Sequence, residues 1–148
     1  DEFARSVDLT SNAWAYHGLA CLYLKSDPEK AKQFIMEGMA LQRERLSYQK
    51  EGFKILEKCG AYKEIDEEYK KQTAENQKNG RIQYYYVAAL AKLERNEEAY
   101  HLLNDGDGID VSDIREGDSD IQSIWESLHE KVYGEKGHLP HYYNFKVN

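Results

Sequence analysis

The chain has 148 residues and a mass of 17.3 kDa, the size of one ordinary domain that buries about two-thirds of its unfolded surface without disulfides or metals. Its 27 acidic residues outnumber its 20 basic ones, and the formal charge of −7 with interspersed basic side chains argues against nucleic acid as a partner. No apolar run approaches the roughly 18 residues of a membrane span, so we expect no membrane partner.

The two cysteines, Cys21 and Cys59, belong to no CxxC or Cys/His spacing. We therefore expect ordinary buried thiols in a reduced, cytoplasmic protein without a cofactor. The first residues contain neither a starting Met nor a secretion signal. The sequence is thus expected to be a fragment of a longer protein.

Helical periodicity of apolar residues along most of the chain, with prolines only at 28 and 140, predicts an all-α fold. The first helix is expected to stop at Ser26. Asp27 followed by Pro28 is a helix start, because the carboxylate caps free backbone N–H groups and the fixed φ of proline suits the first helical position. The second helix then places Ala31, Ile35, Gly38 and Met39 on one stripe. Residues 12–41 are therefore predicted to form a helical hairpin.

A step of 34 residues relates this hairpin to the segments 46–76 and 80–104. Gly18 and Gly52 share the step, and Gly60 is expected at the turn of the second hairpin. Running the step backwards assigns residues 1–10 to the end of a preceding repeat and its linker. The matching apolar positions are Leu19, Phe53 and Val87; Leu22, Leu56 and Leu90; Ala31, Ile65 and Ala99; and Ile35, Tyr69 and Leu103.

This helix–turn–helix period resembles the tetratricopeptide repeat, although Ile65 and Tyr86 stand where small residues would recur. The resemblance implies a right-handed superhelical stack of hairpins. After Asn104 the step ends. An acidic connector is expected at 105–117, a capping helix at 118–133 with Asp118 or Ser119 as its N-cap, and an irregular tail at 134–148.

The segments DIRE (113–116), WESLH (125–129) and LPHYYNFKV (139–147) carry a further resemblance. Together with the repeats they are similar to the carboxyl end of a group of bacterial proteins, in which an amino-terminal domain of unknown function precedes a tetratricopeptide-type array. That domain is thought to resemble mutarotase-like β-sandwiches. The relatives flank the last aromatic with an acidic residue and Arg, whereas this chain has Asn144 and Lys146. The resemblance implies no reaction for the helical end.

The acidic connector does not match the geometry of a calcium-binding loop. A loop starting at Asp105 would place Asp107 third and Glu116 twelfth, but Ile109 takes the fifth place and Asp110 takes the sixth, where glycine is needed. We therefore expect a solvated connector of turns and helix caps, with Arg115 bridging carboxylates, and no metal site. The spacing of His138 and His141 also lacks the further ligands that zinc requires.

No catalytic motif is present, so we expect no enzyme. Twelve tyrosines are the oddity of the composition. In a tetratricopeptide-like stack the first helices line the concave side, and aromatic and cationic residues there can bind a peptide carboxylate or stack on a sugar. The predicted binding residues are Tyr16, Tyr23, Lys50, Lys54, Glu57, Arg81, Tyr84 and Lys92.

The function predicted from these residues is a non-catalytic interaction or scaffold domain. It would bind a peptide, or another domain of its own protein, in a concave groove. The alternative is an accessory wall of a carbohydrate-binding or carbohydrate-active site in the full-length protein, with Trp14 or the tyrosines contacting sugar. Tyrosines that serve only as amphipathic packing, and a homo-oligomer formed through the amino-terminal face, are further alternatives.

Overall fold

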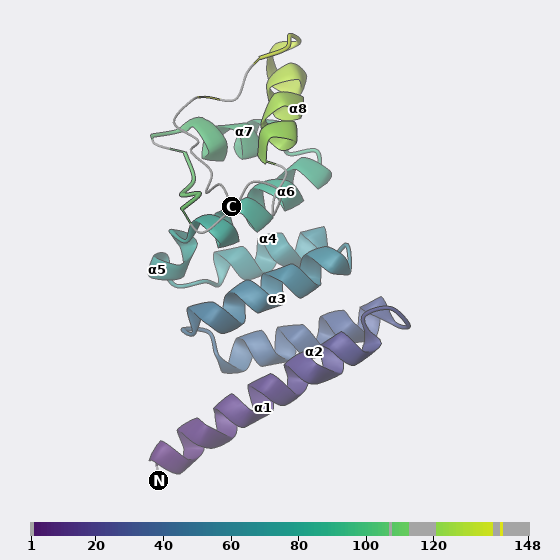
Figure 1. The fold of residues 1–148 in the computed structure, drawn as a ribbon, viewed down its shortest axis with the longest axis vertical. Coiled ribbons are helices and arrows are strands. Elements are labelled where there is room, and N and C mark those ends of the chain that lie inside the picture. Colours follow the sequence, from purple (N-terminus) through teal and green to yellow (C-terminus); the bar gives the residue numbers. More distant parts are fainter. Residues whose placement is uncertain (1, 107, 113–120, 138–139, 141–148) are drawn as a thin grey trace. The chain divides into compact units, whose positions relative to one another are not determined.

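The computed structural model describes residues 2–106, 108–112, 121–137 and 140, and within these ranges every regular element is an α-helix (Figure 1). The all-α prediction is confirmed. The chain divides into two compact units, Asp1–Asn76 and Gln77–Asn148. The helices are α1 (Glu2–Tyr23), α2 (Pro28–Leu41), α3 (Leu46–Lys58), α4 (Tyr62–Lys70), α5 (Ala74–Gln77), α6 (Gly80–Lys92), α7 (Asn96–Asn104) and α8 (Ile121–Tyr133).

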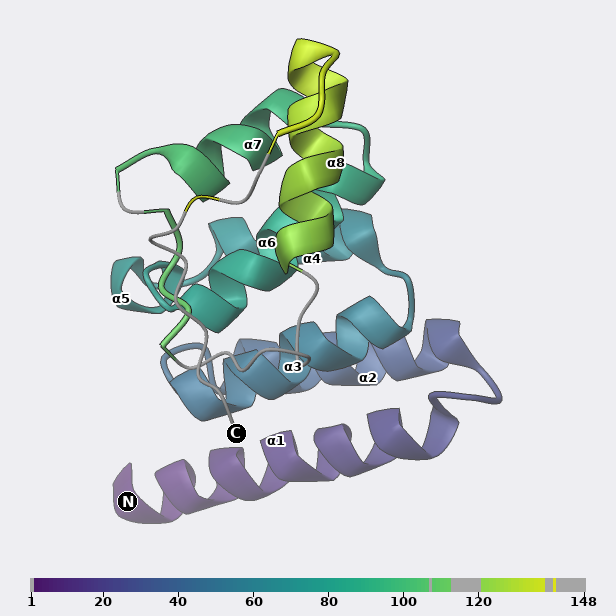
Figure 2. The same ribbon diagram turned by 45° about the horizontal axis from the view of Figure 1, so that its top comes forward.

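In the first unit, α1, α2 and α3 lie side by side in chain order (Figures 1 and 2). The predicted start of α2 is confirmed, because the Asp27 carboxylate accepts a hydrogen bond from the Lys30 backbone N–H at 3.2 Å and Pro28 occupies the first turn. The predicted apolar stripe of α2 is buried. Its Gly38 lies against the Tyr48 ring of α3, where a Cβ atom would clash.

The 34-residue step is visible in the turns of the second and third hairpins. Gly60 and Glu94 are one step apart, and both adopt the left-handed conformation, with φ of 67° and 63°. The N–H group of Ala61 donates to the Leu56 carbonyl in one turn, and that of Arg95 donates to the Leu90 carbonyl in the other. These bonds, again one step apart, close the same helix-ending motif. The two hairpins therefore share local backbone geometry as well as apolar spacing.

A buried polar network joins α2, α3, α4 and α5 in the first unit. The Arg43 guanidinium pairs with the carboxylate of Glu68 at 2.9 Å. Gln49 donates to the backbone carbonyls of Met39 and Gln42 at 3.1 and 2.7 Å, and its own side-chain oxygen accepts from Gln72 at 2.7 Å. Because these groups lie inside the unit, their mutual hydrogen bonds offset the cost of removing them from water.

In the second unit, α7 packs against α6, and α8 packs against both. Ile121, Trp125 and Leu128 form the buried side of α8, and Ile124 and Val132, at helical spacing from them, are half-buried. The indole N–H of Trp125 donates to the Asn104 side-chain oxygen at 2.8 Å. The helix begins at Ile121, and the predicted cap residues Asp118 and Ser119 lie outside the described residues.

Two expectations require correction. Residues 2–23 form one continuous helix, so the linker expected within 1–10 is wrong; the segment contains no Pro or Gly to end a helix. The connector is not fully solvated, because Ile109 and Val111 are buried and the Asp110 carbonyl lies against Gly80 at the start of α6. Asp107, Arg115 and Glu116 lie outside the described residues, as do most residues of the tail.

Candidate functional site

The candidate site is the outer face of α1, and the repeat itself reveals it. Helix α3 buries six residues, and the residues one step earlier on α1 are all exposed. The buried set of α3 is Tyr48, Gln49, Gly52, Phe53, Ile55 and Leu56. The exposed counterparts on α1, which we call the α1 outer face, are Trp14, Ala15, Gly18, Leu19, Cys21 and Leu22.

This exposure corrects two expectations from the sequence. Leu19 and Leu22 were expected to pack like Phe53 and Leu56, but they are 37% and 70% exposed. Cys21 was expected to be buried, and it is exposed as well. The difference arises because α3 packs between the preceding helix α2 and its hairpin partner α4. Helix α1 packs against its hairpin partner α2 and against α3, and no described helix takes the place that α2 has on α3.

Gly18 and Gly52, which occupy the same repeat position on α1 and α3, differ in whether a neighbouring side chain covers them. A Cβ atom at Gly52 would lie 2.4 Å from the Met39 sulfur, so this glycine makes room for a side chain of the preceding helix. A Cβ atom at Gly18 would meet nothing within 4 Å. The same position is therefore filled in α3 and open in α1.

A hollow of about 460 Å³ lies beside this face, and most of its lining is apolar: Asn12, Ala15, Tyr16, Leu19 and Leu41. Ala15 stands where α3 has the longer Gln49. Residues 11–24 contain no Asp, Glu, Lys or Arg. Contiguous exposed apolar surface of this kind marks sites of interaction with other macromolecules.

The inner side of α1 is firmly held, which keeps the outer face in place. Ala13 and Ala20 are fully buried. The Tyr48 hydroxyl donates to the Ala13 carbonyl at 2.5 Å, and the Trp14 ring meets the Tyr48 ring edge-on at 4.9 Å. Burial raises the pKa of Tyr48 well above its usual range, so the hydroxyl keeps its proton and stays a donor.

Five of the binding residues predicted from the sequence belong to the first unit. Tyr16 and Tyr23 both pack on Phe34 of α2, with ring centroids 6.2 and 5.8 Å apart, and the Lys30 ammonium lies 4.4 Å from the Tyr23 ring centroid. These two tyrosines thus help to hold α1 on α2, and Tyr16 also lines the hollow.

The other three residues of this group lie on α3. Lys54 is exposed, whereas Lys50 and Glu57 are half-buried. Burial raises the pKa of the Glu57 carboxyl.

The other three predicted residues belong to the second unit. Arg81 and Tyr84 are half-buried on α6, and Lys92 is exposed near its end. Tyr85 and Tyr86 are buried, which agrees with the expectation that three consecutive tyrosines on a helix point in different directions. A groove shared by residues of both units stays a prediction.

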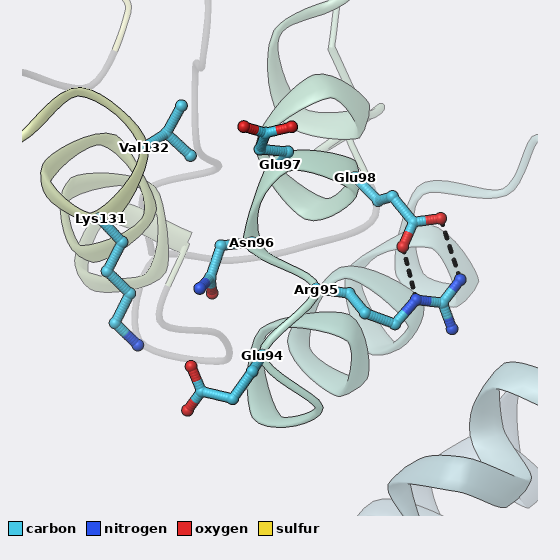
Figure 3. A pocket seen from close by; sticks show the side chains of 7 residues that line it. All are labelled: Glu94, Arg95, Asn96, Glu97, Glu98, Lys131 and Val132. Carbon is cyan, nitrogen blue, oxygen red and sulfur yellow. Dashed lines mark hydrogen bonds and ion pairs between the residues drawn. The ribbon is translucent and has the colours of Figure 1, made fainter.

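A second cavity, in the second unit, encloses about 460 Å³ between the α6–α7 turn and α8 (Figure 3). Glu94, Glu97 and Lys131 contribute charged walls, and Arg95 pairs with Glu98. The figure shows the Arg95–Glu98 pair directed away from Lys131. No residue pattern in the sequence predicts this cavity, and its mixed charges favour no single ligand class.

Comparisons with protein-family models, curated proteins and solved structures give no match. Among the described residues, no helix is long and apolar enough to cross a membrane. The same residues contain no group of three or more His, Cys, Asp or Glu side chains placed to hold a metal ion.

Proposed function

We propose that this chain is a non-catalytic interaction domain built from tetratricopeptide-like helical hairpins, and that it docks a segment of another protein or domain on the α1 outer face. The observation that carries the proposal is the exposure of six α1 residues whose counterparts in α3 are all buried. A repeat array needs a neighbour or a cap over each apolar end face.

The superhelical stack, the cytoplasmic location and the likeness to the carboxyl end of bacterial proteins with a mutarotase-like domain belong to the same proposal. Two observations support the repeat: the shared turn geometry at Gly60 and Glu94, and the full burial of Ala31, Ile65 and Ala99 one step apart. An amino-terminal domain of the same protein is then one natural source of the docked segment.

Docking would cover apolar area on the α1 outer face and gain free energy in proportion to that area. Burying a leucine side chain completely contributes about 1.5–3 kcal/mol. Leu22 is 70% exposed, so covering it contributes roughly 1–2 kcal/mol by that measure. Trp14 and Leu19 are 39% and 37% exposed and add smaller amounts. Loss of Leu22 alone should therefore weaken docking about tenfold.

Site-specific photo-crosslinking in cells tests this function. A photoreactive phenylalanine analogue at Leu22 is expected to capture a protein, and the same analogue at Gln33, an exposed position on α2, is the matched control. The captured segment is then sequenced and produced alone, and its binding should be lost with Leu22→Glu. If position 22 captures nothing beyond the Gln33 control, the proposed function is wrong.

A further inference from the structure

The chemistry of the docked segment can be derived from the α2–α3 interface, and the derivation rests on the proposed function. We propose that the α1 outer face binds an amphipathic α-helix of a partner protein, which lies along α1 as α2 lies along α3. The partner helix places a side chain the size of methionine over Gly18.

The α2–α3 interface supplies the template. The Met39 side chain of α2 lies over Gly52 of α3, and the Tyr48 ring of α3 lies over Gly38 of α2. One glycine on each helix thus receives a large side chain of the other helix. Such paired exchange brings two helices close together along a short segment.

The α1 outer face keeps one half of this arrangement. Gly18 repeats Gly52, and Trp14 repeats the aromatic residue at Tyr48. A helix with a Gly-Met pair like that of α2 would therefore find an open glycine for its methionine, whereas the Trp14 ring already meets the Tyr48 ring of α3 at 4.9 Å. From Asn12 to Leu22 the face is about 15 Å long, which corresponds to about three helical turns of the partner.

The charge and shape of the surroundings restrict the partner further. Residues 11–24 carry no Asp, Glu, Lys or Arg, so a charged residue on the docking stripe of the partner would lose its hydration without gaining an ionic partner from this segment. The hollow beside Ala15 and Leu19 accepts a further apolar side chain. The partner stripe is thus apolar throughout, with one residue for the hollow and one for Gly18.

A second copy of this chain does not offer such a helix. The Gly-Met pair occurs once in the sequence, at Gly38 and Met39, and both residues are already buried between α2 and its neighbours. In the second unit, the helix equivalent to α2 is α7, and it is already packed against α6 and α8 of its own chain. The α2–α3 template therefore favours a helix of a different protein over a second copy of this chain.

The experiment uses a synthetic peptide of residues 27–42, which carries the face of α2 that covers α3. The fluorescently labelled peptide is titrated with the 148-residue protein. We expect saturable binding with a gain of peptide helicity in circular dichroism. Met39→Glu in the peptide should weaken binding by at least about tenfold, because it places a charge on the apolar stripe.

Variants of the protein locate the site. Gly18→Met should weaken peptide binding by at least about tenfold, because it fills the space reserved for the partner side chain. The variant should unfold at the same or a slightly higher temperature, since a Cβ atom at this position meets nothing within 4 Å and methionine is a better helix former than glycine. Gln33→Met, on the exposed side of α2, is the matched control and should bind the peptide normally.

Three outcomes would overturn the proposal: no saturable binding, binding unaffected by Gly18→Met, or a dimer in light scattering that Gly18→Met dissociates, which would assign the face to a second copy. The crosslinking experiment separates this inference from the proposed function. Capture at Leu22 without peptide binding refutes the helix chemistry and leaves the interaction domain standing. If position 22 captures no protein and the peptide does not bind, both the proposed function and the helix chemistry are refuted.

Discussion

Replacing Glu94 with glycine should stabilise the protein, because Glu94 holds a backbone conformation that suits glycine. Its φ of 63° matches the 67° of Gly60, which occupies the same place one repeat earlier. Among the described residues, Glu94 is the one non-glycine residue with positive φ. Its N–H group donates to the Ala91 carbonyl at 3.2 Å, and glycine preserves that bond.

The magnitude follows from two opposing terms. A side chain in the left-handed region costs about 1–2 kcal/mol, because Cβ approaches the following carbonyl oxygen. Glycine also has more conformational freedom in the unfolded chain, which lowers the free energy of unfolding by about 0.5–1 kcal/mol. The net effect of Glu94→Gly is therefore a gain of about 1 kcal/mol in the free energy of unfolding, or a few degrees in Tm.

Urea denaturation followed by circular dichroism measures this gain, and two variants isolate its cause. Glu94→Ala removes the carboxylate, which lines the turn cavity together with Glu97 and Lys131, but keeps the Cβ atom (Figure 3). It should give little of the gain. Gly60→Ala should cost about 1 kcal/mol at the equivalent turn. If Glu94→Ala stabilises as much as Glu94→Gly, the backbone explanation is refuted and charge repulsion takes its place.

Three further predictions concern packing, each measured by urea denaturation. Gly18→Ala should stabilise the protein by up to about 1 kcal/mol, because alanine has the higher helix propensity. Gly52→Ala should destabilise it by about 1–3 kcal/mol, because the Met39 side chain occupies the space of the added methyl group. Equal effects of the two substitutions would contradict the assignment of one open and one filled glycine. Arg43→Ala should lower the free energy of unfolding by roughly 3 kcal/mol, because it leaves the buried Glu68 carboxylate without its ionic partner. The double variant Arg43→Met, Glu68→Leu removes both charges and should recover part of this loss. If it recovers none, the ion pair is not the cause. Trp125→Ala should cost about 3–5 kcal/mol as a large-to-small change in the core of the second unit, and a cost below about 1 kcal/mol would show that the α8 packing contributes little.

Local features of the fold were predictable because short-range chemistry determines them. Asp27 and Pro28 start α2 wherever the helix packs, and Gly60 ends α3 through its own backbone freedom. The buried stripe of α2 followed from helical spacing in the same way. These are properties of neighbouring residues along the chain.

Features that depend on tertiary neighbours were not predictable. Leu22 and Leu56 occupy the same repeat position, and only the presence of another helix decides which of them is buried. Gln49 and Gln72 are buried inside the unit, although polar side chains on a helix usually face water. Their hydrogen bond stabilises them there, and the sequence does not show that they are close in space. The candidate site differs from the rest of the repeat only in burial, because Trp14, Leu19 and Leu22 are exposed where their counterparts in α3 are buried.

Gln49 has a consequence for the axial alignment of neighbouring helices. Its amide donates to the Met39 and Gln42 carbonyls, so α2 can sit on α3 in one axial register only. Ala15, at the equivalent place on α1, has no such donor. In the proposed complex, a helix docked on α1 would be aligned by its side chains over Gly18 and in the hollow, without a hydrogen bond of this kind to its backbone.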